Sequence, residues 1–469
     1  MQKQPFTHNV TIVGFGSIGQ GVLPLLFRHF DLDPSRVVII TADDRGKDVA
    51  EKYGVRFILR PLTPSNYVQA LKPHVSRGDF LLNLSVDVSS VALIKYCQNE
   101  GALYLDTCIE PWSGEYTDPK RSVAERSNYA LRESARALRS SEPRPTAIIA
   151  HGANPGIVSH FVKDALLQLA KDIGLGTTTP ATQEEWAKLA MALDIKTIHI
   201  AERDTQVAEA RKKMGEFVNT WSVDGFCSEG NQPSEMGWGT HEKKLPEGAR
   251  KHRYGSQSAI YLLQPGFLTA VRSWTPISGP QHSWIITHNE AISIADYLTV
   301  RDGEKRVRYR PTVHYAYRPC DDAVLSLHEL AGRNGTMQDE QRLINEEILP
   351  GGADQLGVLL MGHKKNAYWY GSHLTIDAAR ALVPHNSATS LQVTGSVIGG
   401  MVWAIANPDA GVVDADEIDH RVVMDIARPY MGKMMGVYTD WTPLDGRGVL
   451  FPEPLHHDDP WQFSNFRVS

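Results

Sequence analysis

The sequence has few cysteines, and none of them stand in a metal-binding pattern. The chain of 469 residues contains four, at positions 97, 108, 227 and 320, with no Cys-x-x-Cys pair. This wide spacing argues against a disulfide framework and against a structural zinc site. We therefore expect no metal centre.

Long apolar runs and an excess of basic charge are also missing. No stretch reaches about 18 consecutive apolar residues. The opening MQKQPFTHNV lacks the apolar centre of a signal peptide. A net charge of −6 gives no basic surface for nucleic acid. We expect a cytoplasmic protein without membrane or nucleic-acid partners.

The composition that remains is that of a globular protein. Hydrophobic residues make up 42 % of the chain and charged residues 22 %. A chain of this length can form two or three domains, each with its own core.

The clearest positive feature lies close to the start of the chain. A β-branched, apolar run at 10–13 leads into Gly-x-Gly-x-x-Gly at 14–19, and a helix-like apolar pattern follows. Between a strand and a helix, these glycines allow a tight turn, close approach to a pyrophosphate and close packing. The helix N-terminus adds free N–H groups. The predicted cofactor contacts here are Gly14, Gly16, Ser17, Ile18 and Gly19.

The second predicted strand, 36–44, favours NAD over NADP. An acidic residue at the end of this strand usually binds the adenosine ribose. Thr41 stands at the tip, with Asp43 and Asp44 directly after it. No arginine stands at the tip to hold a 2′-phosphate, although Arg45 is near. We predict that Asp43 contacts the ribose.

Strands and helices continue to alternate up to about residue 155. Strands are predicted at 55–59, 80–85, 102–107 and 147–150, with helices at 47–53, 66–71 and 91–100. This order predicts a doubly wound parallel sheet. Ligands bind at the carboxyl ends of such strands, which makes Asn83, Ser85 and Thr107 further predicted cofactor contacts.

The pattern changes after residue 155. A helix at 157–171 is followed by predicted strands at 197–202, 217–223, 259–263 and 284–288, which suggests a mixed or antiparallel sheet. The fold class is therefore α/β: a Rossmann domain at 1–155 and an α+β substrate and dimerisation domain at 156–389. A helix at 390–407 could return to the first domain, and 408–469 is predicted to be a C-terminal arm.

Acidic residues stand beside aromatic and histidine residues at several predicted strand ends. Each has a structural explanation when taken alone. Asp87 could cap the next helix, Trp221 could belong to the core, and His288 could be a structural histidine. The candidate site residues are Asp87, Glu110, Asn154, Glu202, Trp221, Glu229, His288 and Glu290.

Several longer motifs together resemble the bacterial homospermidine synthase family, in the saccharopine-dehydrogenase-like group. They include residues 14–19, Asn83-Leu84-Ser85-Val86-Asp87, Gly152-Ala153-Asn154-Pro155-Gly156, Ala201-Glu202-Arg203-Asp204-Thr205 and Asn219-Thr220-Trp221-Ser222-Val223. Others are Gly237-Trp238-Gly239-Thr240, Thr287-His288-Asn289-Glu290, residues 365–372 and residues 437–443. The likeness extends over nearly the whole chain.

The resemblance implies a reaction and a site. The family joins two putrescines into sym-homospermidine and releases ammonia, with NAD held as a prosthetic group. The implied steps are hydride abstraction, deamination, Schiff-base formation with a second diamine and re-reduction. Trp221, His288, Glu202 and Asn154 are implied to be catalytic, with the Trp221 ring facing the cationic amine. Asp87, Glu110, Glu229 and Glu290 are implied to bind substrate. A homodimer is also implied. Thr41 departs from the family, which carries Asp there.

The residue types suit this chemistry. Putrescine is a dication at neutral pH, and burying it requires carboxylates. The reacting amine must lose its proton before it can lose a hydride. His288, with an ordinary pKa near 6.5, or a carboxylate such as Glu202 could accept that proton. Whether spermidine is also a substrate stays open.

Two other functions remain open on the sequence. A saccharopine dehydrogenase or carboxynorspermidine synthase acts on a carboxylate-bearing secondary amine and would use arginine. Arg203 and Arg272 leave this alternative open. The other is an NAD-binding sensor without catalysis, which has no need of a proton acceptor.

Overall fold

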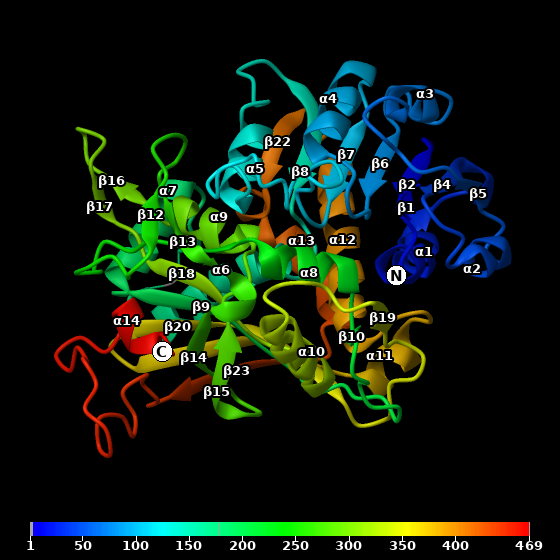
Figure 1. Ribbon diagram of the computed structural model, residues 1–469. Coiled ribbons are helices and arrows are strands. Elements are labelled where there is room, and N and C mark those ends of the chain that lie inside the picture. Colours follow the sequence, from blue (N-terminus) through cyan, green and yellow to red (C-terminus); the bar gives the residue numbers. More distant parts are fainter. Residues whose placement is uncertain (1–2, 177, 469) are drawn as a thin grey trace.

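Two large β-sheets, each with its own helices, make up the fold (Figure 1). The computed structural model describes residues 3–176 and 178–468. Within these ranges one sheet has seven strands and the other has ten. Three short two-stranded pairs lie outside them, β1 (Gln4–Pro5) with β3 (Phe30–Asp31), β10 (Glu216–Asn219) with β19 (Glu340–Leu343), and β16 (Val300–Arg301) with β17 (Val307–Tyr309).

The seven-stranded sheet is parallel throughout. Its strand β2 (Val10–Val13) is buried along its whole length and apolar except for Thr11, as expected of a strand that helices cover on both faces. The predicted doubly wound parallel sheet is confirmed. In spatial order the strands are β22 (Ala410–Asp414), β8 (Arg144–Ile149), β7 (Leu103–Asp106), β6 (Phe80–Asn83), β2 (Val10–Val13), β4 (Val37–Thr41) and β5 (Arg56–Leu59).

Helices pack on both faces of this sheet. One face packs against α1 (Ser17–His29) and α12 (Ala388–Ala406). The other packs against α3 (Tyr67–Leu71), α4 (Ser90–Glu100) and α5 (Asn128–Arg136). The short helix α2 (Lys47–Lys52) precedes β5.

The ten-stranded sheet is mixed, as predicted. Its strands β9 and β18 run parallel, and the other recorded pairs are antiparallel. The main path is β12 (Ala249–Lys251), β13 (Ala259–Pro265), β11 (Pro233–Gly237), β18 (Thr312–Arg318), β9 (Thr197–Asp204), β20 (Ala353–His363), β21 (Asn366–Thr375) and β23 (Lys433–Thr439), and the hairpin of β14 (Ala270–Thr275) and β15 (Gly279–Trp284) joins it at β18.

The remaining helices surround this second sheet. The predicted helix 157–171 is confirmed as α6 (Ile157–Asp172). The others are α7 (Gln183–Ala192), α8 (Val223–Asn231), α9 (Asn289–Tyr297), α10 (Asp321–Gly332), α11 (Ile376–Leu382), α13 (His420–Ala427) and α14 (Phe463–Phe466).

Two predicted strands of the second domain are wrong at their ends. The strand predicted at 217–223 is β10, which ends at Asn219, because Ser222 caps α8 through a bond from the Gly225 N–H at 3.0 Å. Trp221 therefore lies in a turn. The strand predicted at 284–288 ends at Trp284, and 285–288 form an irregular buried segment. Burial explains the apolar run there without strand pairing.

The C-terminal part of the chain contributes to both sheets. Helix α12 returns to α1, where the Asn386 amide donates to the Gly21 carbonyl at 3.1 Å. Strand β22 then pairs with β8, and β23 pairs with β21. This part of the predicted arm 408–469 is thus integrated, because its apolar residues complete both sheets. The division at residues 155 and 389 stays a prediction.

The tail beyond Tyr438, predicted to be extended, also packs on the protein. Its large side chains cover the face of the mixed sheet that carries Trp369. Those side chains are Trp441, Trp461, Phe463 and Phe466. Among the described residues, α12 alone is long and apolar enough to cross a membrane, and 83 % of that stretch is buried inside the protein.

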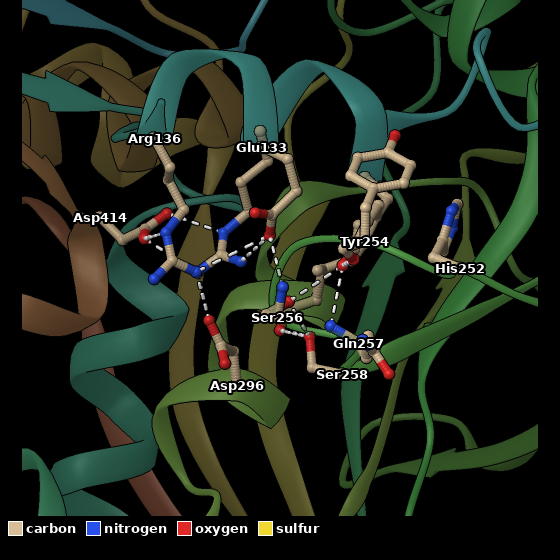
Figure 2. Close-up of polar contacts among 12 residues, drawn as sticks. Glu133, Arg136, His252, Tyr254, Ser256, Gln257, Ser258, Asp296 and Asp414 are labelled. Carbon is tan, nitrogen blue, oxygen red and sulfur yellow. Dashed lines mark hydrogen bonds and ion pairs between the residues drawn. The ribbon is translucent and has the colours of Figure 1, made fainter. Parts of the chain in front are cut away.

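Helix α5 joins the two sheets through buried polar contacts (Figure 2). The Glu235 carboxylate on β11 accepts the N–H groups of Asn128 at 2.6 Å and Tyr129 at 3.2 Å, the first N–H groups of the helix. The Arg132 guanidinium donates two bonds to Asp414 on β22, at 3.0 and 2.9 Å, and one to Asp296 on α9 at 3.1 Å. We call this set the α5 clasp.

Replacing Arg132 by Met should destabilise the protein. The side chain is 2 % exposed, and its loss leaves buried carboxylates short of a partner, which costs about 3 kcal/mol. The urea unfolding midpoint measures this. As a control, Arg421→Met removes an exposed pair with Asp419 and should change stability by about 0.5 kcal/mol at most. Equal losses in the two variants would contradict the importance of the clasp.

Candidate active site

A cleft of about 710 Å³ opens at the carboxyl end of the parallel sheet. Ligands of open α/β sheets bind at this edge. The loops after β2, β4 and β6 form one wall, and α8 with β19 forms part of the other. The predicted cofactor residues that line the cleft are Gly14, Gly16, Ser17, Ile18, Asp43 and Ser85.

The glycines have the geometry that a bound pyrophosphate requires. Gly14 has a φ of +85°, and a Cβ there would lie 2.6 Å from the Ser85 Cα. Gly16 directly precedes α1, and the space that its Cβ would occupy is open. A Cβ on Gly19 would lie 2.9 Å from the Gly14 carbonyl oxygen. The turn therefore leaves room for a phosphate beside the N-terminus of α1.

Three predicted cofactor residues do not line the cleft. Gly19 packs α1 against the turn. The Asn83 side chain accepts a bond from the Ser85 hydroxyl at 2.6 Å. Thr107 lies against Gly152, whose Cβ position is 3.3 Å from the Thr107 Cβ. These residues support the walls, and their direct contact with a cofactor stays a prediction.

The far end of the cleft carries an acid and a base that pair with each other. The Asp43 carboxylate accepts bonds from the Arg45 backbone at 3.0 Å and from its guanidinium at 2.6 Å. Both residues line the cleft just beyond Thr41. The negative charge of Asp43 thus partly offsets the positive charge of Arg45 at the place where a 2′-phosphate would lie.

Deeper in the molecule, His288 lies between two carboxylates. Its Nε2 is 2.9 Å from Glu229 on α8, and its Nδ1 is 3.3 Å from Glu290 in the first turn of α9. Burial by itself would lower the pKa of His288, but the charges of Glu229 and Glu290 outweigh it and raise that pKa to about 10. His288 is therefore an imidazolium at neutral pH. This value lies well above the unperturbed histidine pKa of 6.5 on which a role as proton acceptor at neutral pH was based.

Glu202 is the group whose pKa lies near neutrality. It ends up on the buried face of β9 and accepts bonds from the Asn154 amide at 2.8 Å and the Tyr315 hydroxyl at 2.5 Å. Burial, aided by Asp204, raises the pKa of Glu202 to about 7, while those two bonds oppose the rise. This carboxyl group can both take and return a proton.

The first domain adds two acids from loops after β6 and β7. The Asp87 N–H points at the Glu110 carboxylate at 3.5 Å, and the Asp87 side chain accepts a bond from Ser113 at 3.1 Å. Burial, together with the charge of Glu229, raises the pKa of Glu110 to about 8. The Cys108 thiol reaches Glu229 at 3.9 Å, so it bridges the two domains.

Trp221 joins the same region through two tyrosines. Its indole N–H donates to the Tyr317 hydroxyl at 3.0 Å. The Tyr317 ring stacks on Tyr315, which binds Glu202. The Cys108 thiol, which contacts both Glu110 and Glu229, and the Tyr315 ring, which packs on His288, join these contacts into one group. We call it the acid network, and it contains all eight candidate site residues: Asp87, Glu110, Asn154, Glu202, Trp221, Glu229, His288 and Glu290.

Four further residues belong to this region and escaped the sequence analysis. Tyr315 and Tyr317 stand two apart on β18, a spacing that also fits an ordinary core strand. Asp204 and Asp354 are buried beside Glu202, and the burial and charge of these neighbours hold the pKa of Asp354 well above its usual range. Asp204 follows Glu202 at the strand period, a signal that could have found it.

The two arginines that favoured an amino-acid substrate point elsewhere. Arg203 donates to the Pro319 carbonyl at 3.0 Å and pairs with Asp321, because its position on β9 faces away from Glu202. Arg272 donates to the Arg467 carbonyl at 2.7 Å. Among the described residues, no arginine forms a hydrogen bond or an ion pair with the acid network.

Comparison with known proteins agrees with this geometry. Two family models match, the saccharopine dehydrogenase NADP binding domain at residues 10–148 and the saccharopine dehydrogenase C-terminal domain at 152–439. The chain is 53 % identical to the homospermidine synthase of Blastochloris viridis, over 98 % of this chain and 97 % of that one. It is 51 % identical to that of Mesorhizobium japonicum, over 98 % and 96 %.

A solved structure extends the likeness to three dimensions. The crystal structure of the Legionella pneumophila homospermidine synthase in complex with NAD superposes with a TM-score of 0.93. That chain is 50 % identical, and the match covers 100 % of this chain and 99 % of that one. With such identity along nearly its whole length, the chain belongs to the homospermidine synthase family within the saccharopine-dehydrogenase-like proteins.

Proposed function

We propose that this protein is an NAD-dependent homospermidine synthase, which converts two putrescines into sym-homospermidine and ammonia. The observation that carries the proposal is the acid network, which gathers eight candidate residues from both domains beside a dinucleotide cleft. Family membership supports the same activity. The arginines that an amino-acid substrate would need point away from the network.

The cleft fits NAD. Gly14 and Gly16 leave room for the pyrophosphate, the N-terminus of α1 offers N–H groups, and Asp43 can bind the ribose. When bound, NAD supplies a hydride acceptor and, later in the same turnover, a hydride donor. Since the net reaction involves no oxidation or reduction, the cofactor need not leave.

The acids bind the diamine. An ammonium group placed among buried carboxylates restores the charge balance that burial disturbs. Glu110 and Glu202 have pKa values of about 8 and 7 without it, so a cation beside them favours their ionised forms. The contact between Glu229 and His288 Nε2 holds the Glu229 carboxylate in place.

Glu202 moves the proton. The reacting amine must be neutral to release hydride, and a carboxylate with a pKa near 7 matches proton transfer at neutral pH. The same group can return the proton to the departing ammonia. His288 keeps its proton, so its role is to hold Glu229 and Glu290 in place. Asn154 orients Glu202 through its amide.

Trp221 faces the cationic centre. Iminium and ammonium species occur on both sides of the hydride transfers, and an aromatic face stabilises such cations by about 0.5–2 kcal/mol. The Trp221 side chain lies in a turn and is partly exposed.

We also propose a cytoplasmic homodimer that accepts putrescine. The homodimer follows from the family resemblance. We further propose that spermidine can donate an aminobutyl group. Its middle ammonium group can pair with the same carboxylates that bind putrescine.

The first test is direct. Purified protein incubated with putrescine alone, without added NAD, should form homospermidine and ammonia in equal amounts, measured by chromatography and an ammonia assay. Product that appears only when NAD is added in excess would contradict a retained cofactor. Absence of product under both conditions would contradict the proposed function.

The pH dependence identifies the proton acceptor. Glu202 is protonated below its pKa of about 7 in the free enzyme, so kcat/KM should fall as the pH decreases through 7. In Glu202→Gln the rate should fall about 10²- to 10⁴-fold and lose this acid limb. The matched control is Glu242→Gln, since burial also raises the pKa of Glu242 to about 7, outside the site. A limb that disappears in the control as well would refute the assignment.

Loss of the aromatic face should affect turnover more than cofactor binding. Trp221→Leu should reduce kcat about 2- to 30-fold while the NAD content of the purified protein stays unchanged. Trp238→Leu, which alters a tryptophan packed on Phe463 at the opposite face of the mixed sheet, is the control. Equal losses of kcat and bound NAD in Trp221→Leu would show that Trp221 is only structural.

A further inference from the structure

Two buried tyrosines on β18 have no role in the mechanism above. Tyr315 and Tyr317 are 2 % and 0 % exposed. They stand two residues apart, so both point to the face of the sheet that carries Glu202. Their rings stack with centroids 5.0 Å apart and planes inclined by 11°. Such a pair on a central strand is a rigid element.

Each hydroxyl group contacts a different residue of the proposed site. Tyr317 accepts the Trp221 indole N–H at 3.0 Å. Trp221 lies in the turn between β10 and α8, where no strand pairing fixes its backbone. Its other ring contact is Phe226, at 5.2 Å between centroids. Since an indole N–H donates in one direction only, this bond sets the plane of the ring.

Tyr315 acts on the proton acceptor. Its hydroxyl donates to Glu202 Oε2 at 2.5 Å, the same oxygen that accepts from Asn154. A bond to the ionised carboxylate favours the ionised form. The other groups that face Glu202 are Asp204 on the same strand, Asp354 on β20 and His288 before α9, and of these the two aspartates oppose ionisation while His288 favours it.

The Tyr315 ring also lies against His288, with centroids 4.4 Å apart and planes inclined by 31°. One strand therefore contacts the acceptor carboxylate, the imidazolium and, through Tyr317, the tryptophan. The distance between the aromatic face and the proton acceptor is set by the strand itself.

We propose that Tyr315 and Tyr317 are positioning residues for the reaction, Tyr317 by orienting the Trp221 ring and Tyr315 by holding Glu202 in its ionised, aligned state. The inference rests on the proposed function and extends it to residues that do not touch the reacting atoms.

Tyr315→Phe tests the proposed effect of Tyr315 on Glu202. Without the donor, Glu202 should bind its proton more tightly, so the acid limb of kcat/KM should move upward by about one pH unit. The control Tyr370→Phe removes a bond of 3.1 Å to Asp164, outside the site, and should leave the limb in place. A limb that stays in place in Tyr315→Phe, or moves equally in the control, would overturn this proposed effect.

Tyr317→Phe tests the proposed effect of Tyr317 on the Trp221 ring. It should lower kcat about 3- to 10-fold without moving the acid limb. In the Trp221→Phe background the same change should have almost no effect, because phenylalanine has no N–H to orient. Equal effects in both backgrounds would overturn the link between Tyr317 and Trp221.

The exchange rate of one proton separates this inference from the proposed function. The Trp221 indole proton, assigned by NMR from Trp221→Phe, should exchange slowly with solvent in the unaltered protein and faster in Tyr317→Phe, whatever reaction the protein catalyses. Rapid exchange in the unaltered protein would contradict the bond. If the protein forms no homospermidine but the indole proton exchanges slowly, the proposed function is contradicted while the bond between Trp221 and Tyr317 is supported.

Discussion

The site depends on one constraint, which is the burial of many carboxyl groups around a single imidazolium in the described structure. Glu229 and Glu290 share His288, while Glu110, Glu202 and Asp354 have pKa values raised by burial. Such an arrangement is poorly balanced when empty and improves when a cation enters. The proposed function agrees with this, because a carboxylate-bearing substrate would meet repulsion without an arginine to offset it.

Strand alternation decides which side chains take part. On β9, Glu202 and Asp204 face the site while Arg203 faces away, and on β18 the tyrosines face the same way as Glu202. The parallel sheet supplies Asp87, Glu110 and Asn154 from loops at its carboxyl edge. Neither sheet carries the whole set of site residues. The α5 clasp and the Cys108–Glu229 contact hold the two sheets together and so keep the two parts of the site beside each other.

The parallel sheet could be predicted from the sequence, for an identifiable reason. A buried parallel strand followed by glycines at 14, 16 and 19 has few alternative structures. Trp221 was misplaced on a strand, because local apolar character does not reveal that Ser222 caps a helix. The raised pKa of His288 could not be predicted from the sequence. One of the two carboxylates that raise it, Glu229, is distant in the sequence and contacts His288 only in the folded chain. Tyr315 and Tyr317 were missed because their spacing matches any core strand.

The late strands β22 and β23 connect the order of synthesis to the order of folding. Each large sheet receives a strand from beyond residue 409, so neither sheet is complete until almost the entire polypeptide has left the ribosome. The nascent N-terminal region must wait with an unfilled edge beside β8, exposed to association with other chains. A fragment ending near residue 155 would lack both that strand and the covering helix α12, and would be a poor candidate for an isolated nucleotide-binding module.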